Sequence, residues 1–272
     1  MSEVRSTAQP LGFGTLLTPV HLGAGADATV RFAARLARCL SCRLIGTGAD
    51  QLELPYYGDG AGMVDAVLVE NARAVMEEDL AKAQALFREA AEGVALDWRS
   101  AVDAPAGFVL TQSRAADLIV LARHGKDDPA LGRMGVAPGD VVLELGRPIL
   151  IVPPEVERLA ARSVVIAWKD TRESRRAVQD ALPFLVRADV VTVLSVGADP
   201  ADDGAQDVCG YLAQYGIAAR AVKRPKSGTA VAAEIADLVR LQNADLIVAG
   251  AYGHSRLRER IFGGVTRDLI ET

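Results

Sequence analysis

The chain has 272 residues, half of them apolar, which is enough for one large core or two modest ones. Its formal net charge of −5 argues against general binding to nucleic acid or to an anionic membrane surface, because the field of the protein would repel both. No run of residues is long and charge-free enough to span a bilayer and none resembles a signal peptide, so we expect a cytoplasmic protein.

Three cysteines are too few for the disulfide framework of a secreted protein, and they suit a reducing compartment. Cys39 and Cys42 form one C-x-x-C at the end of an amphipathic run, without the second pair that a zinc site needs. We therefore interpret them as small residues near a helix end, and we expect no metal site.

The first half of the chain alternates short apolar runs, typical of buried parallel strands, with segments of helical spacing. Segment Gln51–Gly62 between them, with its Pro, Gly and Tyr residues, predicts a loop that either covers a site or varies at the surface. The predicted strands are 15–20, 42–47, 96–102, 118–122 and 148–152, and the predicted helices are 28–40, 63–92 and 105–113.

The second half repeats this alternation. Pro153 and Pro154 break the preceding strand, and we place a linker at 153–162 between domains at 11–152 and 163–272. The predicted strands of the second half are 164–168, 190–196, 217–222 and 246–250, and its predicted helices are 172–185, 206–215 and 229–241.

An internal repeat accounts for this order. Residues 116–120 and 244–248 share the sequence Ala-Asp-Leu-Ile-Val, and their offset (244 − 116 = 128) also relates Gly125 to Gly253. We therefore predict an α/β protein of two tandem doubly wound domains, each with a mostly parallel sheet and helices on both faces. The same offset puts the counterpart of 148–152 beyond residue 272, so the second domain is expected to lack its last strand.

A glycine-spaced loop follows the last predicted strand, at the sheet edge where such folds bind ligands. Its glycines permit close backbone approach, and a helix opening near Val265 would offer unpaired amides to an anion. The basic residues nearby are Arg256, Arg258, Arg260 and the turn Lys223–Lys226. They are either phosphate ligands or a solvated surface.

A strand, G-x2-G, nine residues, G, a small residue and a helix together resemble the universal stress protein family in its tandem form, over about residues 11–272. The resemblance implies a stress-response protein whose loop wraps the ribose and phosphates of ATP or AMP, with Mg²⁺ accompanying ATP. Because the sequence has no G-x-x-x-x-G-K-[ST], H-E-x-x-H or G-x-S-x-G motif, we expect a sensor or regulator and not a dedicated enzyme. The candidate nucleotide-binding residues are Trp168, Lys169, Asp170, Val196, Ala249, Gly250, Gly253, His254, Gly263, Gly264, Val265 and Thr266.

Some positions depart from the family pattern. Gly264 stands where the family has Ser or Thr, and Lys169 stands where it has an Asp, so either Asp170 substitutes or that acidic contact is absent. In the first domain Ala122 replaces the first glycine of the motif, and we expect no competent ATP site there. His21 and His124 near that edge either form a pair or are polar surface residues.

Two alternatives remain open. Gly23, Gly25 and Ala28 match the G-x-G-x-x-A fingerprint of dinucleotide-binding proteins, with Asp50 after the next strand. In the second alternative, the chain is an adaptor whose nucleotide sites have decayed. The resemblance further implies that fifth strands meet across a dyad, so we predict a homodimer in which Pro148–Val152 pairs with the same strand of a second chain.

Overall fold

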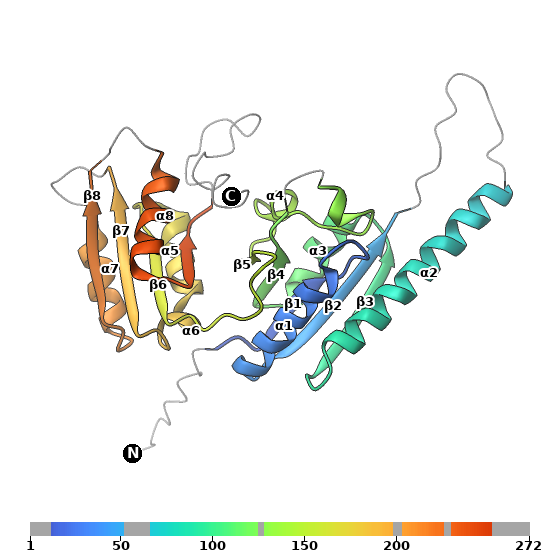
Figure 1. The fold of residues 1–272 in the computed structure, drawn as a ribbon, viewed down its shortest axis with the longest axis horizontal. Helices are drawn as coiled ribbons and strands as arrows, with labels where there is room; N and C mark the ends of the chain where they lie inside the picture. Colours follow the sequence, from blue (N-terminus) through green and yellow to red (C-terminus); the bar gives the residue numbers. More distant parts are fainter. Residues whose placement is uncertain (1–11, 52–65, 125–127, 198–202, 226–229, 252–272) are drawn as a thin grey trace, which may run out of the picture. The chain divides into compact units, whose positions relative to one another are not determined.

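The computed structural model describes residues 12–51, 66–124, 128–197, 203–225 and 230–251 (Figure 1). These residues form two compact units, the first ending at Leu159 and the second beginning at Ala160, which we call the first and second domains. Each holds one parallel sheet between helices, so the predicted α/β architecture of two doubly wound domains is confirmed. The limits 11–152 and 163–272 stay predictions.

The first sheet has the strand order β3-β2-β1-β4-β5, and all its neighbours are parallel. The interiors of β1 and β4 are buried because helices cover both faces of the sheet. The predicted run 42–47 was too short, since β2 continues to Asp50, which pairs with Val102. The strands are β1 (Thr15–Pro19), β2 (Arg43–Asp50), β3 (Leu96–Val102), β4 (Leu118–Ala122) and β5 (Ile149–Val152).

Helices lie on both faces of this sheet (Figure 1). The chain runs from β1 to β3 toward one edge of the sheet and then returns to add β4 and β5 on the other side of β1. Because the crossovers are right-handed, α1 and α2 lie on one face of the sheet and α3 and α4 lie on the other. The elements are α1 (Ala26–Leu40), α2 (Ala66–Ala90), α3 (Pro105–Gln112), η1 (Ser113–Ala115), η2 (Pro129–Leu131) and α4 (Pro138–Val141).

The second sheet has the order β8-β7-β6-β9, which repeats the first four positions of the other sheet. Within the described residues it has four strands and no counterpart of β5. The strands are β6 (Ser163–Ala167), β7 (Val190–Val196), β8 (Ala219–Arg224) and β9 (Leu246–Ala249).

The helices of the second domain differ from the prediction in one respect. The predicted helix 172–185 is two helices, because Pro183 has no N–H to continue the ladder and a new short helix starts beside it. By the same handedness, α5, α6 and α7 cover one face of the sheet and α8 covers the other. The helices are α5 (Arg172–Asp180), α6 (Leu182–Leu185), α7 (Ala205–Ala213) and α8 (Val231–Gln242).

The repeated Ala-Asp-Leu-Ile-Val segments hold the same position in both domains. The carboxylate of Asp117, just before β4, accepts hydrogen bonds from the first backbone amides of β1, at 2.8 and 3.0 Å. Asp245, just before β9, accepts equivalent bonds at the start of β6, at 3.1 and 3.0 Å. The repeated aspartate therefore fastens β4 to β1 and β9 to β6 at the amino ends of these strands.

Candidate functional site

Each sheet has a topological switch point, where two adjacent strands send their connections in opposite directions. In the second domain it lies between β6 and β9, whose last paired residues are Ala167 and Ala249. In the first domain it lies between β1 and β4. Open α/β sheets bind ligands in the crevice beyond the carboxyl ends of such strands, so these two edges are the candidate sites.

Gly250 follows β9 directly and lies against the start of α5. A Cβ on Gly250 would be 2.6 Å from the backbone nitrogen of Ser174 and 2.8 Å from the carbonyl carbon of Glu173. Such distances leave no room for a side chain, so glycine is required here by the packing of β9 against α5. Ala249 beside it is exposed at the edge.

The loop after β6 turns its polar side chains onto α5. Thr171 caps this helix by accepting a hydrogen bond from the Ser174 amide at 3.2 Å. Asp170, which the sequence offered as a substitute acidic contact, bonds Arg175 at 2.7 and 2.9 Å, while Lys169 is exposed. Asp170 is thus held at the surface, against the first turn of α5.

Trp168 fills the edge beside the end of β6. Its side chain is buried, with 7% of the residue exposed, and its indole N–H donates to the carbonyl oxygen of Asp203 at 2.7 Å. Asp203 lies at the start of α7, after β7, so the indole lies toward the β7 side of the edge. Val196, the last residue of β7, is half-buried.

Asp203 joins several elements at this edge. One carboxylate oxygen accepts from the Ala205 amide at 3.1 Å and pairs with Lys223 of β8 at 3.2 Å. Burial raises the pKa of Asp203, but the Ala205 amide, the hydroxyl of Ser195 and the Lys223 ammonium outweigh it, so the pKa lies below its usual range. Sequence reasoning missed this residue, although Asp-Gly before an amphipathic run is a helix-start signal.

The basic segment Lys223–Lys226, which begins in the last residues of β8, carries less positive charge than its sequence suggests. Lys223 pairs with Asp203, and Arg224 pairs with Glu234 of α8 at 3.0 Å. These ion pairs neutralise the described half of the turn, which favours the interpretation as an ordinary surface turn.

The remaining predicted site residues lie outside the described residues. They are Gly253, His254, Gly263, Gly264, Val265 and Thr266, together with Arg256, Arg258, Arg260, Gly125, Lys226 and the segment from 52 to Gly62.

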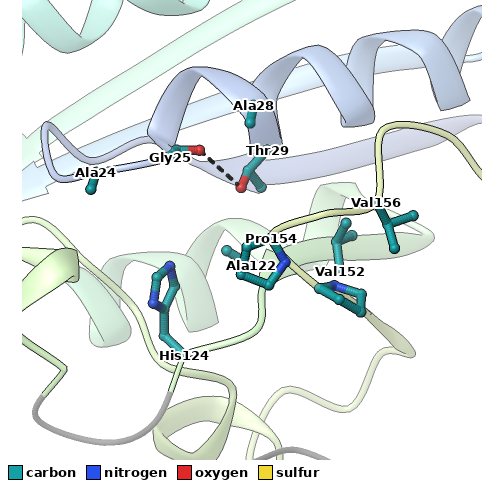
Figure 2. A pocket seen from close by; sticks show the side chains of 10 residues that line it. Ala24, Gly25, Ala28, Thr29, Ala122, His124, Val152, Pro154 and Val156 are labelled. Carbon is teal, nitrogen blue, oxygen red and sulfur yellow. Dashed lines mark hydrogen bonds between the residues drawn. The ribbon is translucent and has the colours of Figure 1, made fainter.

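The switch point of the first domain holds a small cavity of about 50 Å³ (Figure 2). The first turn of α1, including Gly25 and Thr29, lines one side, and His124 and Pro154 line the other. Ligand sites for molecules of drug size measure roughly 300 Å³ or more, so this cavity suits a few waters and not a nucleotide.

His21 and His124 form a pair beside this cavity. Their ring centroids are 5.9 Å apart and their planes nearly perpendicular, and His21 is buried, with Nδ1 accepting from the Gly23 amide at 3.0 Å. Burial, and secondarily His124, lower the pKa of His21 to about 4. The bond from His124 Nδ1, at 2.8 Å, holds the pKa of Asp128 below its usual range.

The fingerprint glycine Gly23 packs against protein. A Cβ there would lie 2.7 Å from the carbonyl carbon of Ala130, and closer still to its oxygen. The loop after β4 therefore occupies the space that a pyrophosphate would need against this glycine. The close approach of the Ala130 carbonyl explains why residue 23 is a glycine, and no bound dinucleotide is needed to explain it.

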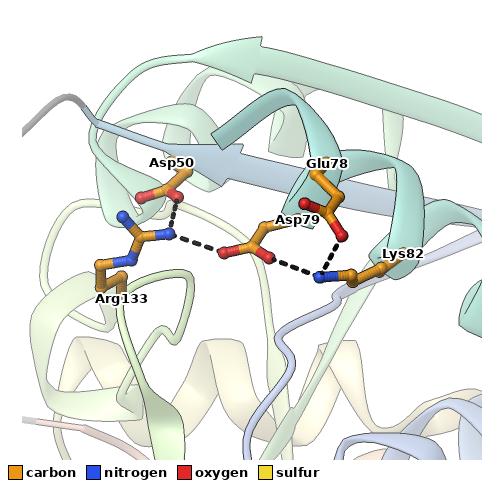
Figure 3. Close-up of polar contacts among 5 residues, drawn as sticks. All are labelled: Asp50, Glu78, Asp79, Lys82 and Arg133. Atoms are coloured by element: carbon orange, nitrogen blue, oxygen red, sulfur yellow. Dashed lines mark hydrogen bonds and ion pairs between the residues drawn. The ribbon is translucent and has the colours of Figure 1, made fainter. Parts of the chain in front are cut away.

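A chain of charges anchors the same loop to the sheet and to α2 (Figure 3). Arg133 forms ion pairs with the fully buried Asp50 at 3.0 Å and with Asp79 of α2 at 2.7 Å, and Asp79 also pairs with Lys82. Arg133 and Asp79 line an open cavity of about 160 Å³. Asp50, the acidic residue of the dinucleotide-binding alternative, is thus held in an ion pair.

Three further features bear on function. Within the described residues, no group of three His, Cys, Asp or Glu side chains is placed to hold a metal ion. Burial raises the pKa of the Cys42 thiol to about 11, which keeps it protonated. Among the described helices, none combines the length and apolar character needed to cross a membrane.

Comparisons with known proteins identify the fold. No protein-family model matches the sequence, and no curated protein matches it. A universal stress protein from Archaeoglobus fulgidus DSM 4304 matches 96% of this chain and 94% of its own, with 14% identity and a TM-score of 0.66. A protein of unknown function from Pseudomonas aeruginosa PAO1 matches 96% of this chain and 90% of its own, with 15% identity and a TM-score of 0.53. The chain therefore has the universal stress protein fold in its tandem, two-domain form.

Proposed function

We propose that this chain is a stress-response protein whose second domain binds an adenine nucleotide, ATP or AMP, at the switch point between β6 and β9. One observation carries the proposal: Gly250 follows β9 directly at this switch point and packs against the start of α5, and the sequence continues from it with the spacing G-x2-G-x9-G. The loop thus begins where an open α/β sheet presents its ligand crevice.

The first domain has a different role in this proposal. Its crevice is filled by the histidine pair and by the loop after β4, which Arg133 fastens to Asp50 and Asp79. One nucleotide per chain is therefore expected, bound in the second domain.

The chain acts as a sensor or regulator in this proposal, and catalysis is not its main task. Two pairs of charged groups at the described carboxyl edge of the second sheet are ion pairs, namely Asp170 with Arg175 and Asp203 with Lys223. With no described cluster of metal-binding side chains, Mg²⁺ would be held chiefly by the phosphates of ATP. Phosphate release from MgATP at a rate typical of enzymes, about one per second or more, would contradict a sensor role.

The adaptor alternative predicts an empty protein. Nucleotide that stays bound through purification, detected by absorbance at 260 nm and identified by mass spectrometry, would support the proposed site. A protein that emerges empty, and whose melting temperature millimolar ATP leaves unchanged, would support the adaptor.

We also propose a homodimer formed through β5. Among the residues that the structure describes, this strand has a neighbour on one side only, and its residues Ile149 to Ile151 are apolar and half-buried. Leu143, on the turn that leads to it, is 67% exposed. An apolar edge of this kind favours pairing with a second chain. Light scattering should give twice the chain mass of 28.7 kDa, and a monomer would contradict the proposal.

A further inference from the structure

The larger cavity of the first domain, of about 160 Å³, is bounded by the loop after β1, by α2 and by the loop after β4. Every residue that lines it lies in the described part of the chain. A cavity of roughly 150 Å³ holds a molecule of the size of benzene, so this one has room for a ligand of about six to eight non-hydrogen atoms. A nucleotide is too large for it.

Two opposite charges line this cavity. Arg133, from the loop after β4, and Asp79, from α2, form an ion pair at 2.7 Å, and both side chains are partly exposed to solvent. Asp50 pairs with the same guanidinium at 3.0 Å but does not line the cavity. The wall therefore presents a positive and a negative group side by side, with no net charge.

Both charged side chains have bonding capacity left. Arg133 uses a single terminal nitrogen, Nη2, for its two ion pairs (Figure 3). Its other terminal nitrogen and its Nε have no partner within the described residues. Asp79 accepts from Arg133 through Oδ2, and its Oδ1 meets Lys82 only at the long distance of 3.4 Å. Since a guanidinium has five N–H donors and a carboxylate about four acceptor positions, each can serve a ligand and keep its present partner.

Apolar side chains form the rest of the wall. Leu131 and Met134 are buried, whereas Leu22 lines the cavity and is still 40% exposed. An apolar group of a ligand placed against Leu22 would remove this surface from water, which favours binding. The cavity thus combines one cation, one anion and an apolar surface.

This charge pattern selects the ligand class. A simple anion bound to Arg133 would lie beside the carboxylate of Asp79, and a simple cation bound to Asp79 would lie beside the guanidinium. Each would be repelled by one of the two lining charges. A molecule that carries both charges close together is attracted by both groups, which is the complementarity that gives a site its specificity.

We propose that the first domain binds a small apolar α-amino acid in this cavity, with its carboxylate on Arg133, its ammonium on Asp79 and its side chain against Leu22. Valine has a size that the cavity holds. The site lies in the first domain and uses no residue of the glycine motif. It therefore adds a second ligand to the proposed function, and either can fail without the other.

Calorimetric titration of the full-length chain with L-valine, isobutylamine and isovalerate tests the proposal. Isobutylamine lacks the carboxylate of valine, isovalerate lacks its ammonium, and both keep the apolar group. Valine should bind with a dissociation constant below about 1 mM, and each analogue at least about tenfold more weakly, because it loses a charge-assisted bond. An analogue that binds as tightly as valine, or no binding of valine at about 10 mM, would overturn the proposal.

Substitution of Asp79 supplies the second arm. Asp79→Asn removes the negative charge, while its side-chain oxygen can still accept from Arg133. Valine should bind to this variant at least about tenfold more weakly than to the wild type, and no more than about threefold more tightly than isovalerate. Glu77→Gln is the matched control, because it removes a charge from the same helix outside the cavity, and valine affinity should stay the same.

Substitution of Leu22 keeps the proposal testable if Asp79→Asn does not fold. Leu22→Ser removes an exposed apolar side chain and should weaken valine binding at least about threefold. Circular dichroism checks that each variant is folded. Valine affinity that is unchanged in a folded Asp79→Asn or in Leu22→Ser, or that falls equally in Glu77→Gln, would overturn the proposal.

Discussion

Gly250 and Ser174 lie so close together that no side chain fits between the end of β9 and the start of α5. The contact joins the two elements that flank the switch point of the second domain. It makes Gly250 a structural residue as well as the first residue of the glycine motif, and the two roles can be separated by experiment.

Gly250→Ala should destabilise the second domain by roughly 1–3 kcal/mol, because the new methyl group would overlap the backbone of α5. Gly210→Ala is the matched control: Gly210 lies inside α7 with open space around it, so this change should stabilise by roughly 0.5–1 kcal/mol. Urea unfolding followed by circular dichroism measures both changes. Equal effects of the two substitutions would mean that β9 does not press on α5.

Removal of the repeated aspartate should weaken both domains to a similar extent. Asp117→Ala and Asp245→Ala each leave two strand-start amides without their carboxylate, at a cost of about 1–3 kcal/mol. Asp189→Ala removes only an exposed pair with Arg162 and should change stability by less than about 0.5 kcal/mol. Calorimetric melting of the three variants makes the comparison, and an Asp189→Ala effect as large as the others would refute this role.

Acid should destabilise the first domain through His21. Its pKa is lowered to about 4 in the folded state from 6.5, so the unfolded chain binds the proton more tightly. The contribution of neutral His21 is complete above pH 6.5 and is lost as the pH falls toward 4. Between pH 7.5 and about pH 5.5 the loss should be about 1–2 kcal/mol. In His21→Asn, whose side-chain oxygen can still accept from Gly23, urea unfolding should show a smaller loss, whereas an unchanged pH dependence would assign it to other groups.

Arg133→Ala should destabilise the first domain by about 2–3 kcal/mol, a value between those of exposed and buried ion pairs, since it removes the cation beside the buried Asp50. Arg73→Ala breaks an exposed pair with Glu77 on the same helix that carries Asp79, and should cost less than about 0.5 kcal/mol. Similar midpoints in urea for the two variants would show that the charges in Figure 3 do not anchor the loop.

The fold was predictable because the repeat and the alternation of strands and helices are carried by short-range patterns. The identical Ala-Asp-Leu-Ile-Val segments located β4 and β9, and each of these strands pairs with the first strand of its own sheet. The break at Pro183 was missed, since the apolar period continues across it and only the absent N–H reveals it.

The site was less predictable because its side chains are arranged by contacts across the sheet. Nothing near Trp168 in sequence indicates that its indole is held by Asp203, which lies 35 residues further along. Likewise, the sequence left open whether His21 and His124 meet, and the structure shows that they do. Such pairings depend on which strand ends lie side by side, which spacing alone does not specify.

The central claim is that the second domain binds one nucleotide per chain. Isothermal titration of nucleotide-free protein with MgATP, repeated with His124→Ala and with Gly263→Asp, tests it most directly. We predict one site per chain, kept in His124→Ala, which alters only the first domain, and lost in Gly263→Asp, which puts a negative charge in the glycine motif. Loss of binding in His124→Ala with retention in Gly263→Asp, or no binding to the wild-type chain at millimolar ATP, would contradict the account.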